Sequence, residues 1–560
     1  MTFTKLFGLA AVAIVCPMVP TTPAQAAPAI PANRNAADFK PQAEALVAAA
    51  FPADGPGAAV IVTRGGKIVY SAGRGLADVE GKRPITPDTP IRLGSIVKQF
   101  TAAVVLQLVG DGKISPDDPI ARFFPDWPQP GAGATVRQLL NHTSGIQDFT
   151  KIPGWISKNR HRAWTTAELL AVTRALPAKS KPGEEWEYNN GGYVVLGAIV
   201  EKVTGKPWHE VLAERITGPL GLKTIAYAAP GDIGDEAARG YTGGGQPVQL
   251  SHMSVAHAAG GLHGSVSDMA RWAHALHHGK VVSAALYQEM IRPARLTDGT
   301  AEPYGFGLRL RQIRGRKALV HGGAGGGLDT DSVYIPSEDL FVAAFANSDQ
   351  PASDPSILTR RLAALALRQA VPTFTPAPVQ ISAVEPLFGT YAGHGGPPLR
   401  FFARDGKLFV GRGEDEKEAF AAGEDRFFFG PNDLTWFSIK RQPGGAHLMD
   451  VHTAEAAAPI RSVRTGSVPP PLTVEEDVLR SYAGTYSTET ITVTVALEEN
   501  GRLTITPAGQ STSPMRPVSQ TEFRLDGTPM RVVFHPENGK VERLTIHRGA
   551  RELHGKRVAE

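Results

Sequence analysis

At 560 residues the chain is too long for one ordinary domain and predicts two to four domains, each with its own core. Apolar residues make up 42% and charged residues 20% of the chain, a composition that excludes a disordered protein. The formal net charge of +4 is too small over this length to indicate nucleic acid or an anionic membrane as partner, which favours a small-molecule or peptide substrate.

Residues 1–26 have the layout of a secretory signal peptide: a cation at Lys5, an apolar stretch after it, and a small-residue cleavage site at Ala24–Ala26. The apolar stretch is too short to span a membrane, so we expect a periplasmic or secreted chain with no integral membrane span. The only cysteine, Cys16, would leave with this segment. Its loss would exclude a disulfide, a thiol nucleophile and a Cys-ligated metal. A lipid anchor on Cys16 is the less favoured alternative, because a bulky valine precedes it.

The stretch 35–370 predicts one domain in which strands flank a helical middle. Two strands joined by a Gly-Gly turn are expected first, helices follow, and period-two strands return at the end. We therefore expect an α/β (α+β) fold whose antiparallel sheet is made from both ends of this stretch and is flanked by helices. The expected strands are Ala58–Gly73, Ser332–Pro336 and Leu340–Asn347, and the expected helices begin near Ser95 or cover Trp164–Leu176, Tyr193–Val203 and Ser267–His278.

Beyond a Pro-rich linker at 371–380 the chain changes character. Short alternating segments separated by Gly, Asp and Asn replace the long helical patterns and predict all-β structure. Two of these segments, described next, resemble each other in sequence. The alternative that this likeness only reflects β-rich composition stays open at this point.

An internal echo suggests two copies of one small barrel. "FGTYAG" around Tyr391 is followed by "GKLFV" from Gly406, and "AGTYS" around Tyr486 is followed at the same offset by "GRLTI" from Gly501. A period this long does not fit a solenoid unit. We expect two small lipocalin-like barrels, joined by the Pro-rich "GSVPPPLT" and covering residues 381–466 and 474–560.

Three short segments carry residues suited to catalysis. Ser95 and Lys98 lie in "LGSIVKQF", Tyr188 and Asn190 in "EYNNGGY", and His321 in "VHGGAGGG". Each segment alone is a weak signal. Their order and context are more specific, because the first opens a helix, the second lies in a loop before a helix, and the third lies at the edge of a late strand.

The spacing of the first segment allows a nucleophile beside its base. Positions i and i+3 share one helix face, so the Ser95 and Lys98 side chains can meet. A serine hydroxyl needs an adjacent base, and burial can lower the pKa of a lysine far enough to serve. A tyrosine phenol near cations can also serve, so Lys98 and Tyr188 both remain candidates. The opposing interpretation is that Ser95 caps a helix and Lys98 is a surface lysine.

Together these segments resemble the active-site motifs of the serine β-lactamase and penicillin-binding protein superfamily. The likeness is to its class C-like branch, in which the second motif is Tyr-x-Asn and the third is Lys-Thr-Gly or His-x-Gly. The resemblance covers about residues 40–365, and two barrels after such a domain resemble the three-domain plan of D-aminopeptidase. Supporting stretches are "LLNHTSGIQDF", "PGEEWEYNNGGYVVLGAIVEKVTG", "GGLHGSVSDMARW" and "YGFGL".

The resemblance implies a β-lactamase/DD-peptidase-like domain with a covalent acyl-enzyme on Ser95. It implies that Lys98 and Tyr188 share proton transfer and that Asn190 binds the substrate amide and orients Lys98. It places His321 near the Tyr188 hydroxyl.

The residues after His321 would bind the substrate backbone. Gly322 and Gly323 would let a substrate lie against the strand edge, since glycine needs no side-chain room. The resemblance also implies that the backbone N–H groups of Ser95 and Ala324 form an oxyanion hole.

The third motif bears on the substrate. A histidine is mostly neutral above pH about 6.5, so His321 anchors a substrate carboxylate less well than the lysine of Lys-Thr-Gly. This favours an aminopeptidase, amidase or esterase over an efficient β-lactamase or carboxypeptidase. Together with the resemblance in domain plan, it implies a D-aminopeptidase-like hydrolase acting on D-amino-acid amides or peptides, without a cofactor. The alternatives are a carboxylesterase or weak β-lactamase of the same fold, and a penicillin-binding sensor or binding protein without turnover.

Other suggestive residues favour simpler interpretations. His274, His277 and His278 have helical spacing, but no acidic or cysteine partner is close in sequence, so we expect an exposed helix surface and no metal site. "GGAGGG" lacks the Lys-Ser/Thr of a phosphate loop. His142 is expected to be turn structure, and the adjacent carboxylates at 184–185 a solvated loop.

Overall fold

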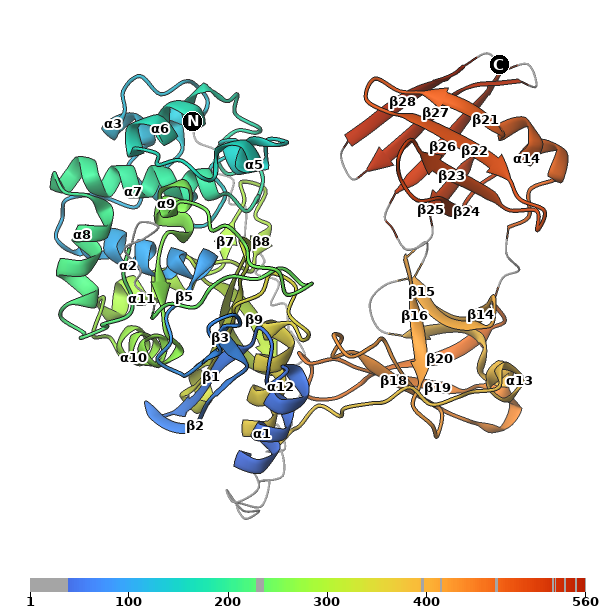
Figure 1. Cartoon of the computed structure of the whole chain (residues 1–560), viewed down its shortest axis with the longest axis horizontal. Helices are drawn as coiled ribbons and strands as arrows, with labels where there is room; N and C mark the ends of the chain where they lie inside the picture. The colour runs from blue at the N-terminus through green and yellow to red at the C-terminus, as the bar shows by residue number, and fades with distance from the viewer. Residues whose placement is uncertain are drawn as a thin grey trace, which may run out of the picture.

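The computed structural model describes residues 39–227, 236–393, 397–412, 415–468, 472–525, 528, 530–537, 540–548 and 551–558. The expected signal peptide at 1–26 lies outside these residues, as does part of the second Pro-rich linker. A mixed helix and sheet domain is followed by two barrels, which lie to one side of it (Figure 1). Among the described residues, no helix combines the length and apolar character needed to cross a membrane.

A six-stranded antiparallel sheet forms the centre of the first domain, in the order β2-β1-β12-β11-β10-β9. Strand β1 pairs along its whole length with β12, which confirms that both ends of this part of the chain build one sheet. The strands are β1 (Ala58–Arg64), β2 (Lys67–Arg74), β9 (Arg309–Ile313), β10 (Arg316–Ala324), β11 (Asp329–Ile335) and β12 (Leu340–Ala346).

Both faces of the sheet are covered by helices. On one face α1 (Phe39–Ala50) and α12 (Pro355–Ala366) pack against Val60, Val62 and their neighbours. On the other face Ala59 and Ile61 join the main core of the domain. This two-sided burial explains why β1 is an almost unbroken apolar run rather than an alternating one.

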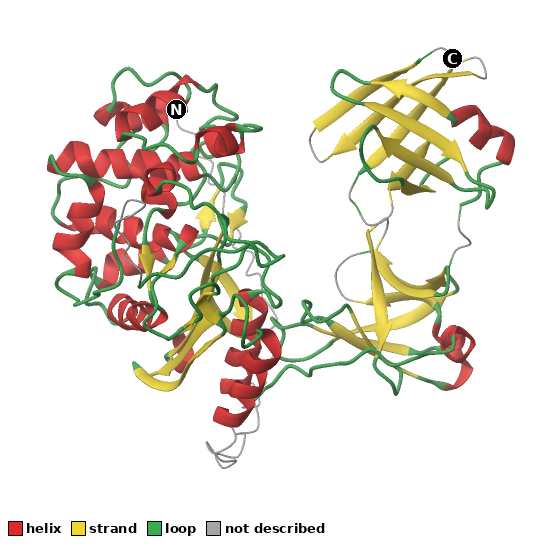
Figure 2. Cartoon of the chain, in the orientation of Figure 1, coloured by secondary structure: helices red, strands yellow, loops and turns green. Residues whose placement is uncertain are grey.

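The remaining helices form a layer on the catalytic-motif side of the sheet (Figure 2). The expected helical segments are all confirmed, with bounds that differ by a few residues. These helices are α2 (Val97–Gly110), α3 (Ile120–Phe123), α4 (Val136–Leu140), α5 (Trp155–Asn159), α6 (Thr166–Ala175), α7 (Asn190–Thr204), α8 (Trp208–Leu212), α9 (Met253–Gly260), α10 (Val266–His277) and α11 (Ala284–Met290).

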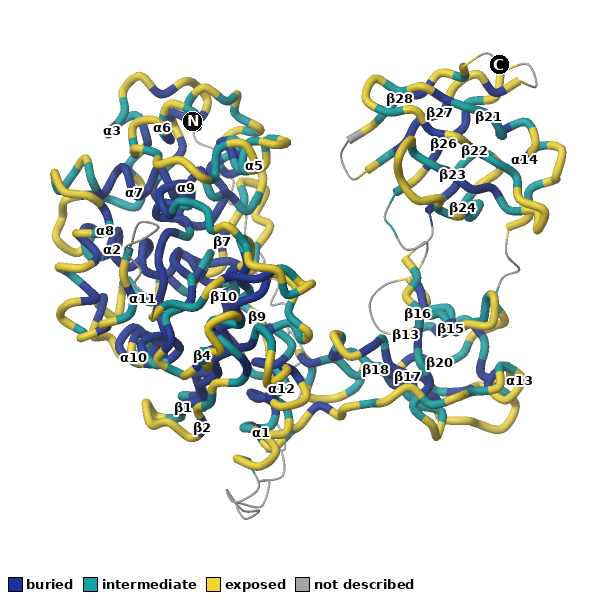
Figure 3. The backbone as a smooth tube through the Cα atoms, viewed as in Figure 1, coloured by how far each residue is buried: buried dark blue, intermediate teal, exposed yellow. Residues whose placement is uncertain are grey.

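Three short two-stranded sheets tie loops to this layer, and α2 lies deep within it, in the buried interior of the domain (Figure 3). The pairs are β3 (Leu76–Asp78) with β4 (Arg83–Pro84), β5 (Ile91–Arg92) with β6 (His263–Gly264), and β7 (Ala294–Arg295) with β8 (Ala301–Glu302).

The C-terminal region folds into two closed barrels in which each strand pairs with the next in sequence, as predicted. The first contains β13 (Gly389–Gly393), β14 (Leu399–Arg404), β15 (Lys407–Arg412), β16 (Asp415–Ala421), β17 (Arg426–Phe428), β18 (Trp436–Lys440), β19 (Leu448–His452) and β20 (Ile460–Gly466), preceded by α13 (Ile381–Val384). The second contains β21 (Gly484–Ser487), β22 (Thr492–Leu497), β23 (Leu503–Pro507), β24 (Ser513–Pro517), β25 (Glu522–Leu525), β26 (Arg531–Glu537), β27 (Lys540–Arg548) and β28 (Arg551–Arg557), preceded by α14 (Glu476–Tyr482).

The internal echo corresponds to equivalent positions in the two barrels. Tyr391 and Tyr486 both lie buried in the first strand of their barrel. Each hydroxyl donates a hydrogen bond to the backbone oxygen four residues earlier, that of Leu387 in one barrel and of Tyr482 in the other. The shared contact confirms two copies of one fold and removes the alternative of a purely compositional likeness.

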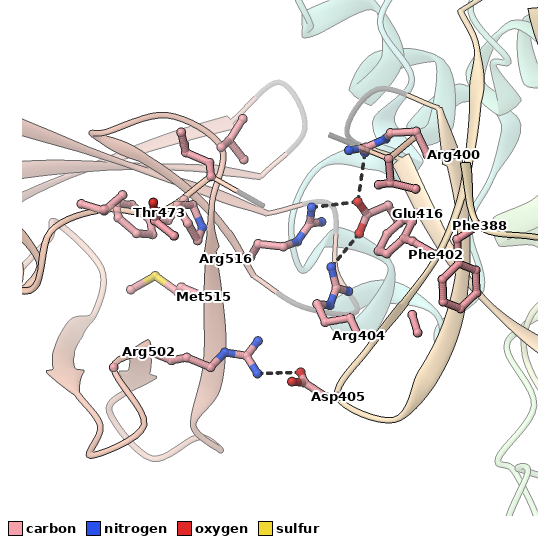
Figure 4. A pocket seen from close by; sticks show the side chains of 18 of the residues that line it. Phe388, Arg400, Phe402, Arg404, Asp405, Glu416, Thr473, Arg502, Met515 and Arg516 are labelled. Carbon is pink, nitrogen blue, oxygen red and sulfur yellow. Dashed lines mark hydrogen bonds and ion pairs between the residues drawn. The ribbon is translucent and has the colours of Figure 1, made fainter. Parts of the chain in front are cut away.

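The barrels are joined to each other and to the first domain by polar contacts. The β9–β10 turn docks on the first barrel, where the backbone N–H of Gly315 donates to the oxygen of Glu455. Between the barrels lies a cavity of about 850 Å³. In Figure 4 the buried Glu416 of the first barrel accepts from Arg516 of the second as well as from two arginines of its own barrel.

Candidate active site

Ser95 lies in a tight turn between a short strand and the central helix of the domain. Gly94 takes the left-handed conformation (φ +53°), and a single 3₁₀ turn over Gly94–Ile96 leads into α2. The residues at the starts of these two helices make no side-chain capping hydrogen bond. The Ser95 hydroxyl is instead 3.1 Å from the Nζ of Lys98, so the contacts do not favour a capping role.

The Lys98 amine is fully buried and has three polar neighbours. Besides Ser95, its Nζ lies 2.9 Å from Oδ1 of Asn190 and 2.8 Å from the backbone oxygen of Ala259. Both of these oxygens are acceptors only, so they require N–H donors from the lysine. A neutral amine has two N–H groups and one lone pair, which leaves the lone pair for the Ser95 hydroxyl.

The surroundings of Lys98 also favour the neutral amine. Burial lowers its pKa to about 7, the carboxylate of Asp148 opposes this shift, and the guanidinium of Arg309 adds to it. A large share of the amine is therefore unprotonated near neutral pH, as a general base requires.

The Lys98 amine also lies over the ring of Tyr188. The Nζ of Lys98 lies 4.7 Å from the centre of the Tyr188 ring. The Tyr188 hydroxyl is buried and forms no hydrogen bond of good geometry with a described residue. Burial raises the pKa of Tyr188, and the nearby Ser95 hydroxyl and Arg309 oppose this rise only in part. The phenol therefore keeps its proton at neutral pH and suits a proton donor better than a base.

Asn190 is the first residue of α7 and is held from behind by Asp148. Its Nδ2 lies 3.3 Å from Oδ2 of Asp148 and 3.0 Å from the hydroxyl of Thr150. The backbone N–H of Asn190 donates to the same Asp148 oxygen. The Asn190 side chain thus orients Lys98 through Oδ1, while its amide nitrogen already has two protein acceptors and is less available to a substrate.

His321 lies in β10 and is buried. Its Nε2 is 2.9 Å from the hydroxyl of Tyr304, and its Nδ1 is 2.7 Å from the oxygen of Gly322. Burial, with Lys98 and Arg309 nearby, lowers the pKa of His321 to about 3. Its ring centre is 6.2 Å from that of Tyr188, and its hydrogen bonds go to other groups. His321 is thus a neutral residue of the site wall.

The glycines after His321 allow β10 to approach the Ser95 turn. A Cβ on Gly323 would lie 2.2 Å from the oxygen of Leu93 and 2.7 Å from the nitrogen of Ser95, closer than real contacts allow. A Cβ on Gly94 would likewise meet the nitrogen of Ala324 at 3.2 Å. The backbone nitrogens of Ser95 and Ala324 therefore lie on facing segments, as an oxyanion hole needs. Gly322 is less crowded, with the nearest atom at 3.0 Å.

Most of this domain matches one known protein family. Residues 45–367 match the family described as beta-lactamase, which is more than half of the chain. The chain belongs to the beta-lactamase family.

Individual relatives of this beta-lactamase-family chain include peptidases. A D-aminopeptidase of Brucella anthropi is 30% identical over 343 residues, which are 61% of this chain and 64% of that protein. A D-aminopeptidase of Brucella ovis is 30% identical over 342 residues, with 60% and 64% covered. The matched segment thus spans less than two thirds of each relative. The octameric penicillin-binding protein homologue from Pyrococcus abyssi has a similar structure, with a TM-score of 0.52, 26% identity, and 73% of this chain and 96% of that chain covered.

An aromatic wall behind the beta-lactamase-family motifs was not predicted. Tyr304 bonds to His321, and the ring of His142 packs 4.5 Å from Tyr188 and 4.6 Å from Tyr304. His142 does adopt a turn conformation (φ +67°), as expected. It is also buried, and burial lowers its pKa well below the usual value, so the ring is neutral.

Arg309 is the second feature that the motifs did not reveal. It follows "YGFGL" at the start of β9, and its guanidinium lies 5.3 Å from the ring centre of Tyr188 and 5.9 Å from that of Trp186. It makes no ion pair with a described residue. The only sequence signal was its place directly after a stretch that resembles the family.

Two other sequence interpretations have different outcomes. The carboxylates at 184–185 are exposed, as expected. The expectation of an exposed surface for "HALHHG" is wrong in part, because the His277 ring stacks on Tyr334 with 3.7 Å between centres and its Nδ1 lies 2.7 Å from the Tyr287 hydroxyl. Packing of α10 against the sheet and α11 leaves His277 only partly exposed.

Proposed function

We propose that this chain is a serine hydrolase that cleaves amide bonds through an acyl-enzyme on Ser95, with Lys98 as the general base. The observation that carries the proposal is the placement of the Lys98 amine. Two acceptors take its N–H groups, which aims its lone pair at the hydroxyl 3.1 Å away. The same lysine is buried and has a pKa of about 7.

The acylation step follows from these positions. The Ser95 oxygen attacks the substrate carbonyl carbon while its proton passes to the Nζ of Lys98. Negative charge develops on the carbonyl oxygen, and the N–H groups of Ser95 and Ala324 stabilise it. The carbon–nitrogen bond then breaks, and the departing amine takes up a proton.

Tyr188 has a separate role in this scheme. Because its pKa is raised, its hydroxyl can donate a proton to the leaving nitrogen and recover one from the Lys98 ammonium. The ester left on Ser95 is then attacked by water, whose proton passes to Lys98. Release of the acid returns the proton to Ser95 and leaves the site as it began.

The substrate class we propose is that of D-amino-acid amides or peptides with an N-terminal D residue. Similarity to the D-aminopeptidases of Brucella supports it. The neutral His321 supports it as well, because it offers no positive charge at the third motif for a free carboxylate. No cofactor takes part in the scheme.

Arg309 favours a second candidate substrate, one with a carboxylate near the scissile bond, such as a β-lactam or a peptide with a free C-terminus. Its guanidinium stands over Tyr188 without an ion-pair partner among the described residues. An arginine without an ion-pair partner is suited to bind a substrate carboxylate. The two candidates place opposite charges on the substrate, so they can be separated.

The deciding experiment is a panel of substrates. Purified protein is assayed with D-alanyl and L-alanyl anilides, a chromogenic cephalosporin and a nitrophenyl ester, each with wild type and Ser95→Ala. Turnover of the D-alanyl anilide above the L form supports the first candidate. Turnover of the cephalosporin alone supports the second. Turnover of the ester alone would indicate a carboxylesterase. A stable adduct without turnover would indicate a penicillin-binding sensor and contradict both candidates.

We also propose that the mature protein acts in the periplasm or outside the cell. The charge, apolar stretch and small-residue site of residues 1–26 support export. Cell fractionation with detection of the mature N-terminus tests it, and a cytoplasmic, uncleaved chain would contradict it.

A further inference from the structure

Two histidines near the end of α10 and one aspartate of the central sheet form a cluster outside the catalytic site. His274, His278 and Asp339 each offer one nitrogen or oxygen, and these atoms lie within 4.8 Å of one another. The histidines are one helical turn apart, with ring centres separated by 4.1 Å. Asp339 lies in the turn between β11 and β12.

The hydrogen bonds of His278 leave a conflict that a cation would resolve. Its Nδ1 lies 2.8 Å from the backbone oxygen of His274, which can only accept, so Nδ1 must carry the proton. In a neutral ring Nε2 then has a lone pair, yet it lies 3.1 Å from Oδ2 of Asp339. Two lone pairs at this distance repel. Either a second proton on the ring or a metal ion between the two atoms is required.

His274 also has a ring nitrogen that is free to serve as a ligand. Its Nδ1 is buried and has no hydrogen-bond partner among the described residues. An imidazole nitrogen that carries no proton has a lone pair and can bind a metal ion. A Cβ on Gly66 would lie 2.7 Å from this nitrogen, so the β1–β2 turn closes one side of the cluster.

Asp339 is held in place by other parts of the fold. Its backbone is in the left-handed region (φ +43°), and its backbone oxygen accepts from the N–H of Gly65 at 2.9 Å. Its Oδ1 accepts from the Tyr334 hydroxyl at 3.0 Å, which leaves Oδ2 for His278. The Asp339 side chain is about one-third exposed, so an ion from solvent can reach it.

We propose that His274, His278 and Asp339 bind one Zn²⁺, with water as the fourth ligand. Two imidazoles and one carboxylate suit zinc and not magnesium or calcium, which prefer oxygen ligands alone. Ligand atoms about 2.0–2.2 Å from a tetrahedral zinc lie roughly 3.3–3.5 Å from each other. The 3.1 Å contact between His278 and Asp339 is close to this spacing, and the ligand atom of His274 lies within 4.8 Å of both.

The sequence predicted no metal here because it showed no acid near "HALHHG". Asp339 is 61 residues from His278 along the chain, and the packing of α10 on the sheet brings the two together. The site would join the end of α10 to the β1–β2 and β11–β12 turns. The catalytic site lies near the other end of α10, because the helix starts beside β6, and β6 pairs with the strand before Ser95. The helix has twelve residues and is about 18 Å long, which separates the two sites. We therefore expect zinc to stabilise the fold without taking part in catalysis.

The test uses full-length protein purified without a polyhistidine tag and stripped with a chelator that is then removed. Zn²⁺ binding is measured by calorimetry at pH 7.5, and thermal unfolding is followed with and without Zn²⁺. The variants are His278→Gln and Asp339→Asn, the latter because asparagine also tolerates left-handed backbone. His161→Gln, which removes an exposed histidine elsewhere, is the matched control.

We expect one Zn²⁺ per chain, a higher Tm with Zn²⁺, and an affinity lowered about tenfold or more in both variants and unchanged in the control. Circular dichroism of each metal-free variant shows whether it is folded. If folded wild type neither binds Zn²⁺ at micromolar concentration nor gains Tm, the contact is an ordinary protonated His–Asp pair and the proposal is wrong. Binding that survives in both variants would equally overturn it. Neither result depends on the substrate of Ser95.

Discussion

The Nζ of Lys98 lies 3.1 Å from the Oγ of Ser95, and the two other polar partners of that amine can only accept hydrogen bonds. The arrangement assigns the lone pair of a neutral lysine to the serine hydroxyl. It also separates two residues that the sequence left equivalent. Lys98 has a lowered pKa and suits the base, whereas Tyr188 has a raised pKa and suits the acid.

Lys98→Met removes the amine while filling nearly the same buried space. We expect kcat to fall about 100- to 10,000-fold, since this is the usual contribution of a general base. The measurement is kcat on the best substrate of the panel, with circular dichroism to show that the fold persists. Lys113→Met, at an exposed lysine, is the control and should keep full activity. Near-normal turnover by folded Lys98→Met would exclude Lys98 as the base.

The pH dependence of kcat/KM should report Lys98. The active form is the neutral amine, so activity should rise with pH and level off above a midpoint near 7. His321 and His142 have lowered pKa values and are already neutral over this range, so they should add no limb near 7. A profile that is flat from pH 5 to 9 would contradict this assignment.

Asp148→Asn should change the same profile. The Asp148 carboxylate raises the pKa of Lys98, so its removal should move the midpoint to lower pH. Asp148 also accepts from the backbone of Asn190 and Gly191, and an amide cannot replace all these bonds. We therefore expect the free energy of unfolding to fall by about 1–3 kcal/mol. We expect kcat to fall as well, because Asn190 loses this support. An unchanged midpoint in the folded variant would show that Asp148 does not influence Lys98.

Gly323→Ala tests the approach of β10 to the Ser95 turn. The added Cβ would overlap backbone atoms of Leu93 and Ser95, so the two segments must separate. We expect kcat to fall about 100- to 1,000-fold through loss of the oxyanion hole, with a smaller effect on KM. Gly133→Ala, where a Cβ meets no atom within 4 Å, is the matched control. Equal activity in the two variants would argue against an oxyanion hole at this edge.

Arg309→Gln distinguishes the two candidate substrate classes. If Arg309 binds a substrate carboxylate, KM for the cephalosporin should rise about tenfold or more, while KM for the uncharged ester changes little. Arg309 also lowers the pKa of Lys98, so both assays belong at pH 9, where Lys98 is neutral in each protein. An equal change in KM for both substrates would show that Arg309 does not bind the substrate carboxylate.

Local patterns explain what the sequence predicted well. Ser95 and Lys98 are three residues apart, so their contact follows from helix geometry. The long helices follow from periodic burial, the central strands β1 and β12 follow from short apolar runs, and the barrel repeat follows from matched Tyr and Gly positions.

Packing between distant segments explains what the sequence missed. Asp148 supports Asn190 across 42 residues, and no periodic signal marks such a contact. Arg309 reaches Tyr188 only because β9 lies beside β10 at the sheet edge. His321, which the resemblance places near the Tyr188 hydroxyl, forms its side-chain hydrogen bond with Tyr304, the first residue of "YGFGL", and the resemblance of that stretch did not reveal this contact.

Intact-protein mass spectrometry during turnover tests the central claim most directly. Wild type and Ser95→Ala are each mixed with the best substrate of the panel, quenched within milliseconds to seconds, and digested to locate any adduct. We expect a transient mass increase equal to the acyl group, confined to the peptide that contains Ser95, and neither adduct nor turnover in Ser95→Ala. Continued turnover by Ser95→Ala, or an acyl group on another residue, would contradict the account.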